Sequence, residues 1–307
     1  MSNLYIVGNG FDLHHDLKTS YSDFKKFLEK KEKCLFLKSL YDYFDSENLW
    51  SSFEEALGDI EIFKYINLYI PQIKSNSFFG KRISNEFIRY LRNYLYQWIR
   101  SIKIDIDIHG KKCLPINQNS IFLSFNYTNT LEILYNIDQS NIFYLHGKCT
   151  KDNNSSLIIG HNSDEIISFE NYLIKYYGFD NDKKILELID GYCKDYSIKK
   201  SKMKYIFMKL NDYQKKMKKN HSCQMKLNNI VFNEMKMYKR IIILGHSLGD
   251  VDSVYFNTIF NSCNDDTPII VSYYDKKSLK KLKEQVRKYK IDKKVIYTEF
   301  KNIPFFD

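Results

Sequence analysis

The stretch Leu4-Tyr5-Ile6-Val7-Gly8-Asn9-Gly10 decides the fold, because a short apolar run that ends in Gly-x-Gly is typical of a buried strand feeding a tight turn. Apolar runs of the same kind recur along the chain and predict further strands. They are Ser120–Phe125, Ile142–Leu145, Leu157–Ile159, Arg240–Leu244, Ile269–Tyr273 and Val295–Tyr297.

Apolar residues at helical spacing fill the intervals between these runs. Residues 20–44, 50–63, 85–102, 254–260 and 279–289 have this spacing, and from Phe169 to about Lys239 the chain is helical and basic, as in an insertion or lid. Strands that alternate with helices favour a parallel sheet with helices on both faces. We therefore expect an α/β protein with a Rossmann-like, doubly wound, mostly parallel sheet and helical insertions.

The chain is long enough to bury a sizeable core, and we expect a single domain over residues 1–307. The sheet core comes from about 1–20, 118–165 and 238–307. The helical insertions come from about 20–117 and 166–237.

Composition narrows the class of protein. With 44% hydrophobic residues the chain is of the globular type, and no apolar run approaches the roughly 18 residues that span a bilayer. The N-terminus lacks the features of a secretory signal, so we expect a cytoplasmic protein without a membrane partner. None of the six cysteines forms a C-x-x-C pair, which argues against a zinc ribbon, and scattered cytoplasmic thiols are mostly buried.

The positive charge is concentrated in one segment. Residues 183–239 hold 15 lysines against 5 acidic residues, which equals the net charge of +10 of the whole chain. A solvated helical surface explains such a run, and so does a surface that binds nucleic acid or an acidic partner. Both readings stay open here.

The first candidate site is the turn Gly8-Asn9-Gly10 with Asp12. Glycines at a strand end let backbone N–H groups approach a phosphate, but a plain tight turn also uses them. Leu13 stands where a dinucleotide fingerprint has its third glycine. Asp12 is suited either to capping a helix or to meeting a ribose hydroxyl.

Polar residues also follow two further strands. Asn126 and Thr128 come after Ser120–Phe125, where they serve either as ligand contacts or as caps of a helix that starts near Leu131. His146-Gly147 follows Ile142–Leu145, and His146 is either a base or a structural hydrogen-bonding residue. His161, in Ile159-Gly160-His161, is a weaker candidate of the same kind.

The last candidate is Gly245-His246-Ser247-Leu248-Gly249, which fits the G-x-S-x-G nucleophile elbow. In that fold a histidine must follow the acid, and no histidine follows His246, so a serine triad of the usual order cannot form. We interpret Ser247 as a phosphate or ribose contact, with Asp250 and Asp252 fixing the turn. No metal-binding motif is found, and His14-His15 has no ligand partner at helical spacing, so we expect no metal.

Together these motifs resemble the AbiH family of bacterial abortive-infection proteins, which protect a bacterial population against phage. The matching stretches are Ile6–Leu13 with Thr19–Phe24, Trp50–Leu57, Phe125–Thr130, Leu145–Gly147, Ile159–His161 and Leu244–Asp252. The resemblance implies an antiviral defence protein. The basic segment matches no motif.

A more distant resemblance is to sirtuin-like NAD-binding domains. Gly8–Gly10, Ser124–Thr128, His146-Gly147 and Gly245–Ser247 fall in the order of their glycine turn, Asn-containing strand end, His-Gly pair and late Gly-x-Ser turn. The resemblance implies NAD as substrate or ligand, with Asn126 orienting the ribose or water and His146 acting as base or polar partner. The implied ligand-binding set is Gly8, Asn9, Gly10, Asp12, Thr128, Gly245, Ser247 and Asp250. Asn9 replaces a small residue and Thr128 an aspartate of the sirtuin-like pattern, which indicates a changed substrate or lost catalysis.

Our leading expectation is a phage-defence effector that binds and hydrolyses NAD or a related nucleotide. One alternative is a nucleic-acid-binding or nuclease effector that uses residues 183–239, and another is a sensor without catalysis. Further candidate partners are a phage component, nucleic acid and a second copy of the chain.

Overall fold

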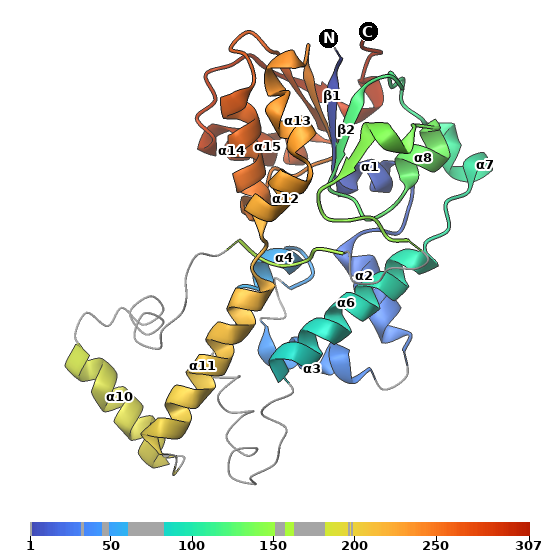
Figure 1. Cartoon of the computed structure of the whole chain (residues 1–307). Helices are drawn as coiled ribbons and strands as arrows, with labels where there is room; N and C mark the ends of the chain where they lie inside the picture. The colour runs from blue at the N-terminus through green and yellow to red at the C-terminus, as the bar shows by residue number, and fades with distance from the viewer. Residues whose placement is uncertain are drawn as a thin grey trace. The chain divides into compact units, whose positions relative to one another are not determined.

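A computed structural model describes residues 2–31, 34–44, 49–60, 83–150, 157–162, 182–195, 197 and 199–307. It divides into two compact units (Figure 1). Unit 1 comprises Met1–Phe27, Arg92–Ile159 and Asn220–Asp307, and unit 2 comprises Leu28–Leu91 and Gly160–Lys219. The expectation of a single domain over 1–307 stays a prediction.

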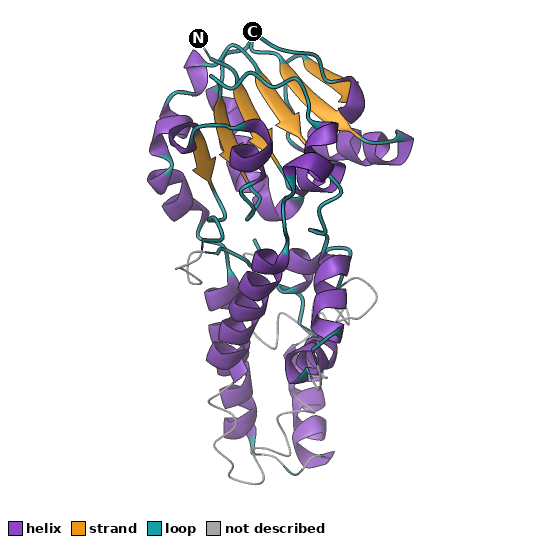
Figure 2. Ribbon diagram, turned by 90° about the vertical axis from the view of Figure 1, so that its right-hand side faces the viewer, coloured by secondary structure: helices purple, strands orange, loops and turns teal. Residues whose placement is uncertain are grey.

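Unit 1 contains a six-stranded sheet in which every neighbouring pair is parallel. The strands are β1 (Leu4–Val7), β2 (Ile121–Ser124), β3 (Ile142–Tyr144), β4 (Ile241–Leu244), β5 (Ile269–Tyr273) and β6 (Val295–Glu299). Their order in the sheet is β3-β2-β1-β4-β5-β6. The strands β2 and β3 therefore lie on one side of β1, and β4, β5 and β6 lie on the other side, so the strand order reverses between β1 and β4. Helices lie on both faces of the sheet (Figure 2), which confirms the Rossmann-like doubly wound α/β fold.

The helices of the described chain range from 4 residues in α4 to 19 residues in α6. They are α1 (Asn9–His14), α2 (Tyr21–Glu29), α3 (Leu35–Tyr43), α4 (Phe53–Ala56), α6 (Ile83–Ser101), α7 (Ile106–His109), α8 (Thr130–Tyr135), α10 (Asp182–Asp195), α11 (Lys200–Met217), α12 (His221–Leu227), α13 (Asn229–Asn233), α14 (Ser253–Ser262) and α15 (Lys276–Lys288). No helix among them is both long and apolar enough to cross a membrane.

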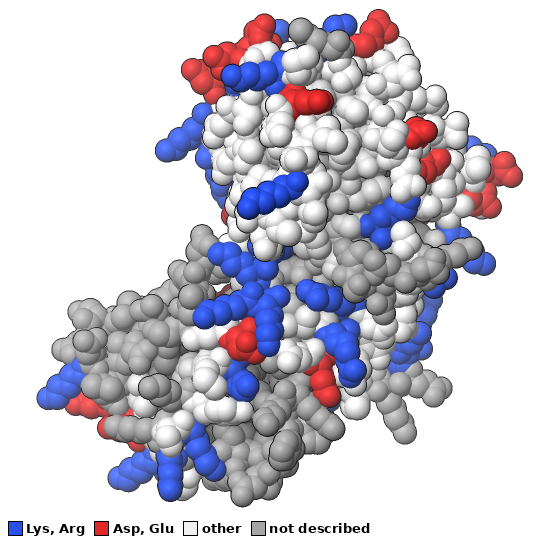
Figure 3. Space-filling model, viewed as in Figure 1, with Lys and Arg blue, Asp and Glu red and all other residues white. Residues whose placement is uncertain are grey.

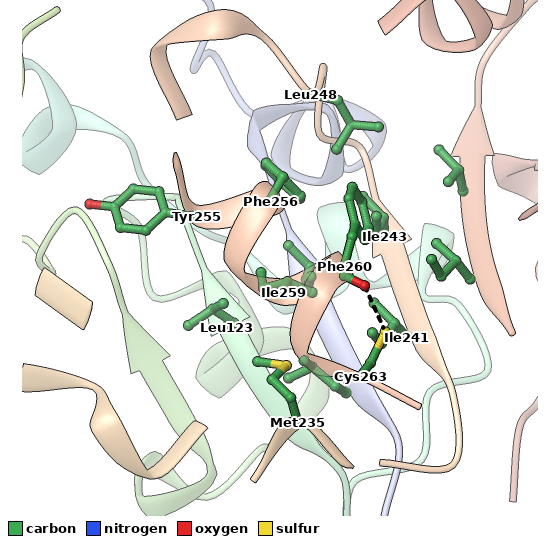
Figure 4. Close-up of a cluster of buried hydrophobic side chains, with 14 of the residues drawn as sticks. Leu123, Met235, Ile241, Ile243, Leu248, Tyr255, Phe256, Ile259, Phe260 and Cys263 are labelled. Carbon is green, nitrogen blue, oxygen red and sulfur yellow. Dashed lines mark hydrogen bonds between the residues drawn. The ribbon is translucent and has the colours of Figure 1, made fainter. Parts of the chain in front are cut away.

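The central strands are buried on both faces, which explains why they are continuous apolar runs. Leu4 and Ile6 point into one core with Phe256 and Ile259 of α14. Tyr5 and Val7 point into the other core. Figure 4 shows the first core, in which Leu123 and Ile243 from two strands face the apolar side of α14.

Two predictions of local structure are wrong. Leu157–Ile159 is not a strand, although Leu157 and Ile159 are buried, because its apolar character reflects packing rather than pairing with a neighbouring strand. The helical pattern predicted over 50–63 forms only the single turn α4, and Ile60 makes an antiparallel bridge with Phe44 instead. The end of that pattern beyond Ile60, and residues 169–181 of the predicted basic helical segment, lie outside the described residues.

Unit 2 has its own core, formed by aromatic side chains and one buried ion pair. Phe87 of α6 contacts Phe36 and Tyr213 at ring distances of 5.2 and 5.8 Å. Lys219, just after α11, is fully buried and lies 2.6 Å from Glu54 of α4. This ion pair joins the two sequence segments of unit 2.

Candidate functional site

The turns after β1 and β4 lie side by side at the carboxyl edge of the sheet. The Gly10 N–H donates to the Gly245 carbonyl at 2.8 Å, and the Gly8 N–H donates to the Leu244 carbonyl at 2.9 Å. A Cβ on Gly8 would lie 2.7 Å from the His246 Cα, and one on Gly10 would lie 2.8 Å from the Gly245 Cα. These glycines are therefore needed for the close packing of the two turns.

The G-x-S-x-G turn is not a nucleophile elbow in this structure. The left-handed residues are Gly245 at φ 65° and Leu248 at φ 56°, and not Ser247. Ser247 is exposed, and no histidine in the described chain is hydrogen-bonded to its hydroxyl. An elbow holds its serine at the strained position, beside a base. The geometry agrees with the absence of a triad in the sequence.

Asn126 connects the loop after β2 to the turn after β1. Its side-chain Nδ2 donates to the Gly8 carbonyl at 3.1 Å, and its own N–H donates to the Ser124 hydroxyl. The capping interpretation is wrong for Asn126 and Thr128, because α8 starts at Thr130 with Asn129 as its N-cap residue. The amide of Asn126 instead fixes the relative position of two strand ends.

Asp12 is buried in α1 and does not cap a helix, since the N-cap residue of α1 is Gly8. Both carboxylate oxygens accept hydrogen bonds, from Thr128 at 2.6 Å and from Thr130 at 2.7 Å. Burial raises the pKa of Asp12 to about 6, although hydrogen bonds from Thr128, Thr130 and Asn126 act to lower it. Thr128 and Asp12 thus form one buried polar cluster.

Two histidines and one aspartate from two distant segments of the sequence meet beside the β2 strand end. The Nε2 of His146, which follows β3, lies 3.2 Å from Oδ1 of Asp252, and Nε2 of His246 lies 3.5 Å from Oδ2 of the same carboxylate. All three residues are buried. This cluster unites the predicted base His146 with two residues for which no catalytic or binding role was predicted.

Aromatic rings hold the two histidines of this cluster. Phe125 contacts His146 edge-on at 5.2 Å and His246 at 4.3 Å. Tyr255 packs against Phe125, and His221 packs against Tyr255 while hydrogen-bonded to the Val251 carbonyl. Packed rings of this kind restrict the rotation of both imidazoles.

An aromatic group with an exposed member lies at the end of β5. Tyr274 is half exposed, stacks on buried Phe300 at 5.2 Å, and donates its hydroxyl to the Gly10 carbonyl at 3.4 Å. His14 packs against Phe300 at 4.6 Å. Tyr274 therefore presents a held aromatic ring beside the β1 turn.

The remaining predicted residues have contacts of their own outside the His146–Asp252–His246 group. Asn9 donates its side-chain amide to the Thr19 carbonyl, and exposed Asp250 forms an ion pair with Lys288 at 3.0 Å. His161 belongs to unit 2, where its backbone pairs with Lys218 and burial lowers its pKa to about 4. In the described part of the chain, no three His, Cys, Asp or Glu side chains are arranged to hold a metal ion.

Sequence reasoning missed the roles of Asp252, His246 and Tyr274. The first two stand in the motif Leu244–Asp252, but a carboxylate shared between two imidazoles is visible only when β3 and α14 are brought together. Tyr274 directly follows the β5 run, and that position was the available signal.

Comparison with known proteins agrees with the motifs. A family model described as bacteriophage abortive infection AbiH matches residues 4–274, from the first residue of β1 to the residue after β5. No curated protein and no solved structure matches the chain. The matched range includes every side chain of the His146 cluster, and by this match the chain belongs to the AbiH family of bacteriophage abortive-infection proteins.

Proposed function

We propose that this abortive-infection protein binds NAD or a related nucleotide along the carboxyl edge of the sheet and hydrolyses its nicotinamide–ribose bond. The observation that carries the proposal is the buried His146–Asp252 pair beside the β2 strand end. In open α/β sheets ligands bind outside the carboxyl ends of the strands, where the strand order reverses. The sirtuin-like order of the motifs supports the same ligand.

The reaction needs few groups. Water attacks the anomeric carbon of the ribose, the carbon–nitrogen bond breaks, and nicotinamide leaves with the electron pair as a neutral molecule. His146 accepts the proton that water loses, and a positioned base of this kind contributes about 10²–10⁴-fold. Asp252 holds the imidazole in place at 3.2 Å.

Asn126 orients the ribose in this proposal. Its amide nitrogen is bonded to the Gly8 carbonyl, so the side-chain oxygen is the atom available to a ribose hydroxyl or to the water. Holding the ribose and the water in place before the reaction reduces the entropy that is lost in reaching the transition state. This reduction is a large part of catalysis.

Tyr274 supplies the surface for the base of the nucleotide. A base stacked on an aromatic ring gains about 1–3 kcal/mol. From β2 to β5 there are three inter-strand steps, roughly 14 Å at about 4.8 Å each. A dinucleotide suits this span better than a mononucleotide.

The decisive experiment measures cellular NAD by mass spectrometry during phage infection. Wild-type cells should lose NAD, whereas cells with Asn126→Ala or His146→Ala should keep it. His109→Ala, a histidine outside the cluster, is the matched control and should behave as wild type. Unchanged NAD in wild-type cells that are still protected against phage would refute the hydrolase.

The part played by Tyr274 has a separate test by calorimetry on purified protein. Tyr274→Ala should weaken NAD binding about 5- to 150-fold, the equivalent of one stacked base. Nicotinamide mononucleotide, which lacks the adenine, should bind both proteins equally, and Tyr274→Phe should bind NAD nearly as tightly as wild type. Equal NAD affinity of the alanine variant would remove Tyr274 from the site.

A second candidate function is nucleic-acid binding by residues 183–239. It is supported by exposed lysines, among them Lys199, Lys202 and Lys215, and Figure 3 shows basic side chains gathered over α10 and α11.

NAD binding without turnover would instead favour a sensor that regulates a partner.

A further inference from the structure

Asp252 lies between two imidazoles, one on each carboxylate oxygen. The distances are 3.2 Å from Oδ1 to Nε2 of His146 and 3.5 Å from Oδ2 to Nε2 of His246. The side chains of the histidines are 5% and 6% exposed, and that of Asp252 is 12% exposed, so little water competes for these contacts. A carboxylate only accepts hydrogen bonds, so a neutral imidazole facing it carries its proton on the facing nitrogen.

The tautomer of His246 is fixed from its other side. The Leu248 backbone N–H donates to Nδ1 of His246 at 2.9 Å, and a backbone N–H has no other role than donor. The Nδ1 atom is therefore the unprotonated nitrogen, and Nε2 carries the proton that points to Asp252.

The donor itself is held rigidly. Leu248 is fully buried, has φ 56°, and its carbonyl accepts the Tyr289 hydroxyl at 3.0 Å. A non-glycine residue in this left-handed conformation persists only where its surroundings determine it. Leu248 therefore cannot turn its N–H away from His246 without leaving the core.

We infer that His246 and Asp252 act as positioning residues that fix His146 in the Nε2–H tautomer, so that the base is its Nδ1 atom. His246 occupies Oδ2 of the carboxylate and leaves Oδ1 for His146. Phe125, in edge-on contact with both rings, prevents either imidazole from flipping. The catalytic consequence rests on the proposed function, whereas the tautomers do not.

The test is the nitrogen NMR spectrum of the histidine side chains, which distinguishes Nε2–H from Nδ1–H. It is recorded at about pH 8, where a histidine of ordinary pKa is neutral, and assigned with His146→Gln and His246→Gln. In the wild type both rings should be Nε2–H. His146 in the Nδ1–H form would overturn the inference, and the tautomer itself is measured on the wild type.

Asp252→Asn gives a sharper second reading. The amide has one oxygen and one NH₂ group, so one imidazole must face a donor and accept through Nε2. His246 cannot do so, because its Nδ1 already accepts from Leu248. We expect His146 to change to Nδ1–H while His246 stays Nε2–H, and a switch of His246 or of neither ring would contradict the shared-carboxylate arrangement.

Activity separates this inference from the proposed function. With the base in the wrong tautomer, Asp252→Asn should slow NAD loss about 10²–10⁴-fold, as loss of the base does. Nε2–H tautomers in a wild type that leaves NAD intact would refute only the hydrolase. NAD loss by a wild type with Nδ1–H at His146 would refute only the positioning by Asp252.

Discussion

Individual glycines set how closely the turn after β1 and the turn after β4 approach each other. Gly245 has φ 65°, and a Cβ there would lie 2.2 Å from the Phe11 backbone nitrogen. The left-handed φ of Gly245 and its close approach to Phe11 accompany the hydrogen bond from the Gly10 N–H to the Gly245 carbonyl. This bond holds the turn after β1 against the turn after β4. The sequence motif Gly-x-Gly therefore has a packing cause in addition to any ligand.

Gly245→Ala should destabilise the protein. The left-handed conformation alone costs about 1–2 kcal/mol for a residue with a side chain, and the overlap with Phe11 adds to it. Urea unfolding measures the loss. The control is Gly110→Ala, where φ is −68° and the nearest atom is 3.8 Å from the new methyl group, so its change should stay within about 0.5 kcal/mol. Equal stability of the two variants would contradict the packing argument.

The buried carboxylate of Asp12 predicts an inverted dependence on pH. Its folded pKa, about 6, lies above the ordinary value of 3.8, so its proton is held more tightly in the folded state. The resulting stability is present below the unfolded pKa and is lost as pH rises through the folded one. A shift of this size corresponds to about 3 kcal/mol.

Asp12→Asn isolates this effect. The stability of wild type minus that of the variant should fall by about 3 kcal/mol between about pH 3 and about pH 7. Burial lowers the pKa of His15 to about 4 and acts with the opposite sign, but it is common to both proteins and cancels. A difference in unfolding free energy that is constant with pH would show that Asp12 titrates normally.

Among the elements, the six strands of the sheet were predictable because each is an apolar run closed by a turn. The β4 strand, Ile241–Leu244, is fully buried and could be read directly. The prediction of a strand at Leu157–Ile159 was wrong because this apolar run does not pair with a neighbouring strand. Apolar character indicates burial and does not indicate hydrogen-bond partners. Asp252 and His246 were missed for a related reason, because they lie 106 and 100 residues from His146 in the sequence and only the packing of the fold brings them together.

The ends of α4 and α11 in unit 2 depend on one buried ion pair. Lys219→Ala removes the fully buried ammonium group that lies 2.6 Å from the Glu54 carboxylate, and breaking such a pair costs about 3–5 kcal/mol. Hydrogen exchange of the α11 amides should accelerate accordingly. On the same helix, Lys216→Ala removes a pair with Asp212 that is 40% exposed at both ends, so its effect should stay below about 1 kcal/mol. Similar exchange in both variants would mean that the buried pair contributes little.

For the whole molecule, the charge excess has a structural explanation that needs no ligand. Ile206, Leu210 and Met217 form the buried side of α11, while Lys202 and Lys215 are exposed. An amphipathic helix needs a polar face, and lysine fills it. The proposed nucleotide function rests on the His146 cluster, so the lysine surface is the feature to test against it.

Reversing Lys199, Lys202 and Lys215 to glutamate provides that test, because all three are exposed and lie outside unit 1. If the proposed function is right, the triple variant should protect against phage and deplete NAD like wild type. A nucleic-acid effector would behave otherwise: loss of three phosphate contacts would reduce the salt dependence of DNA binding by a slope of roughly 3 and abolish protection. Measuring protection, NAD and salt-dependent DNA binding on the same variant therefore separates the two functions. Lost protection with intact NAD depletion would move the function to the lysine surface.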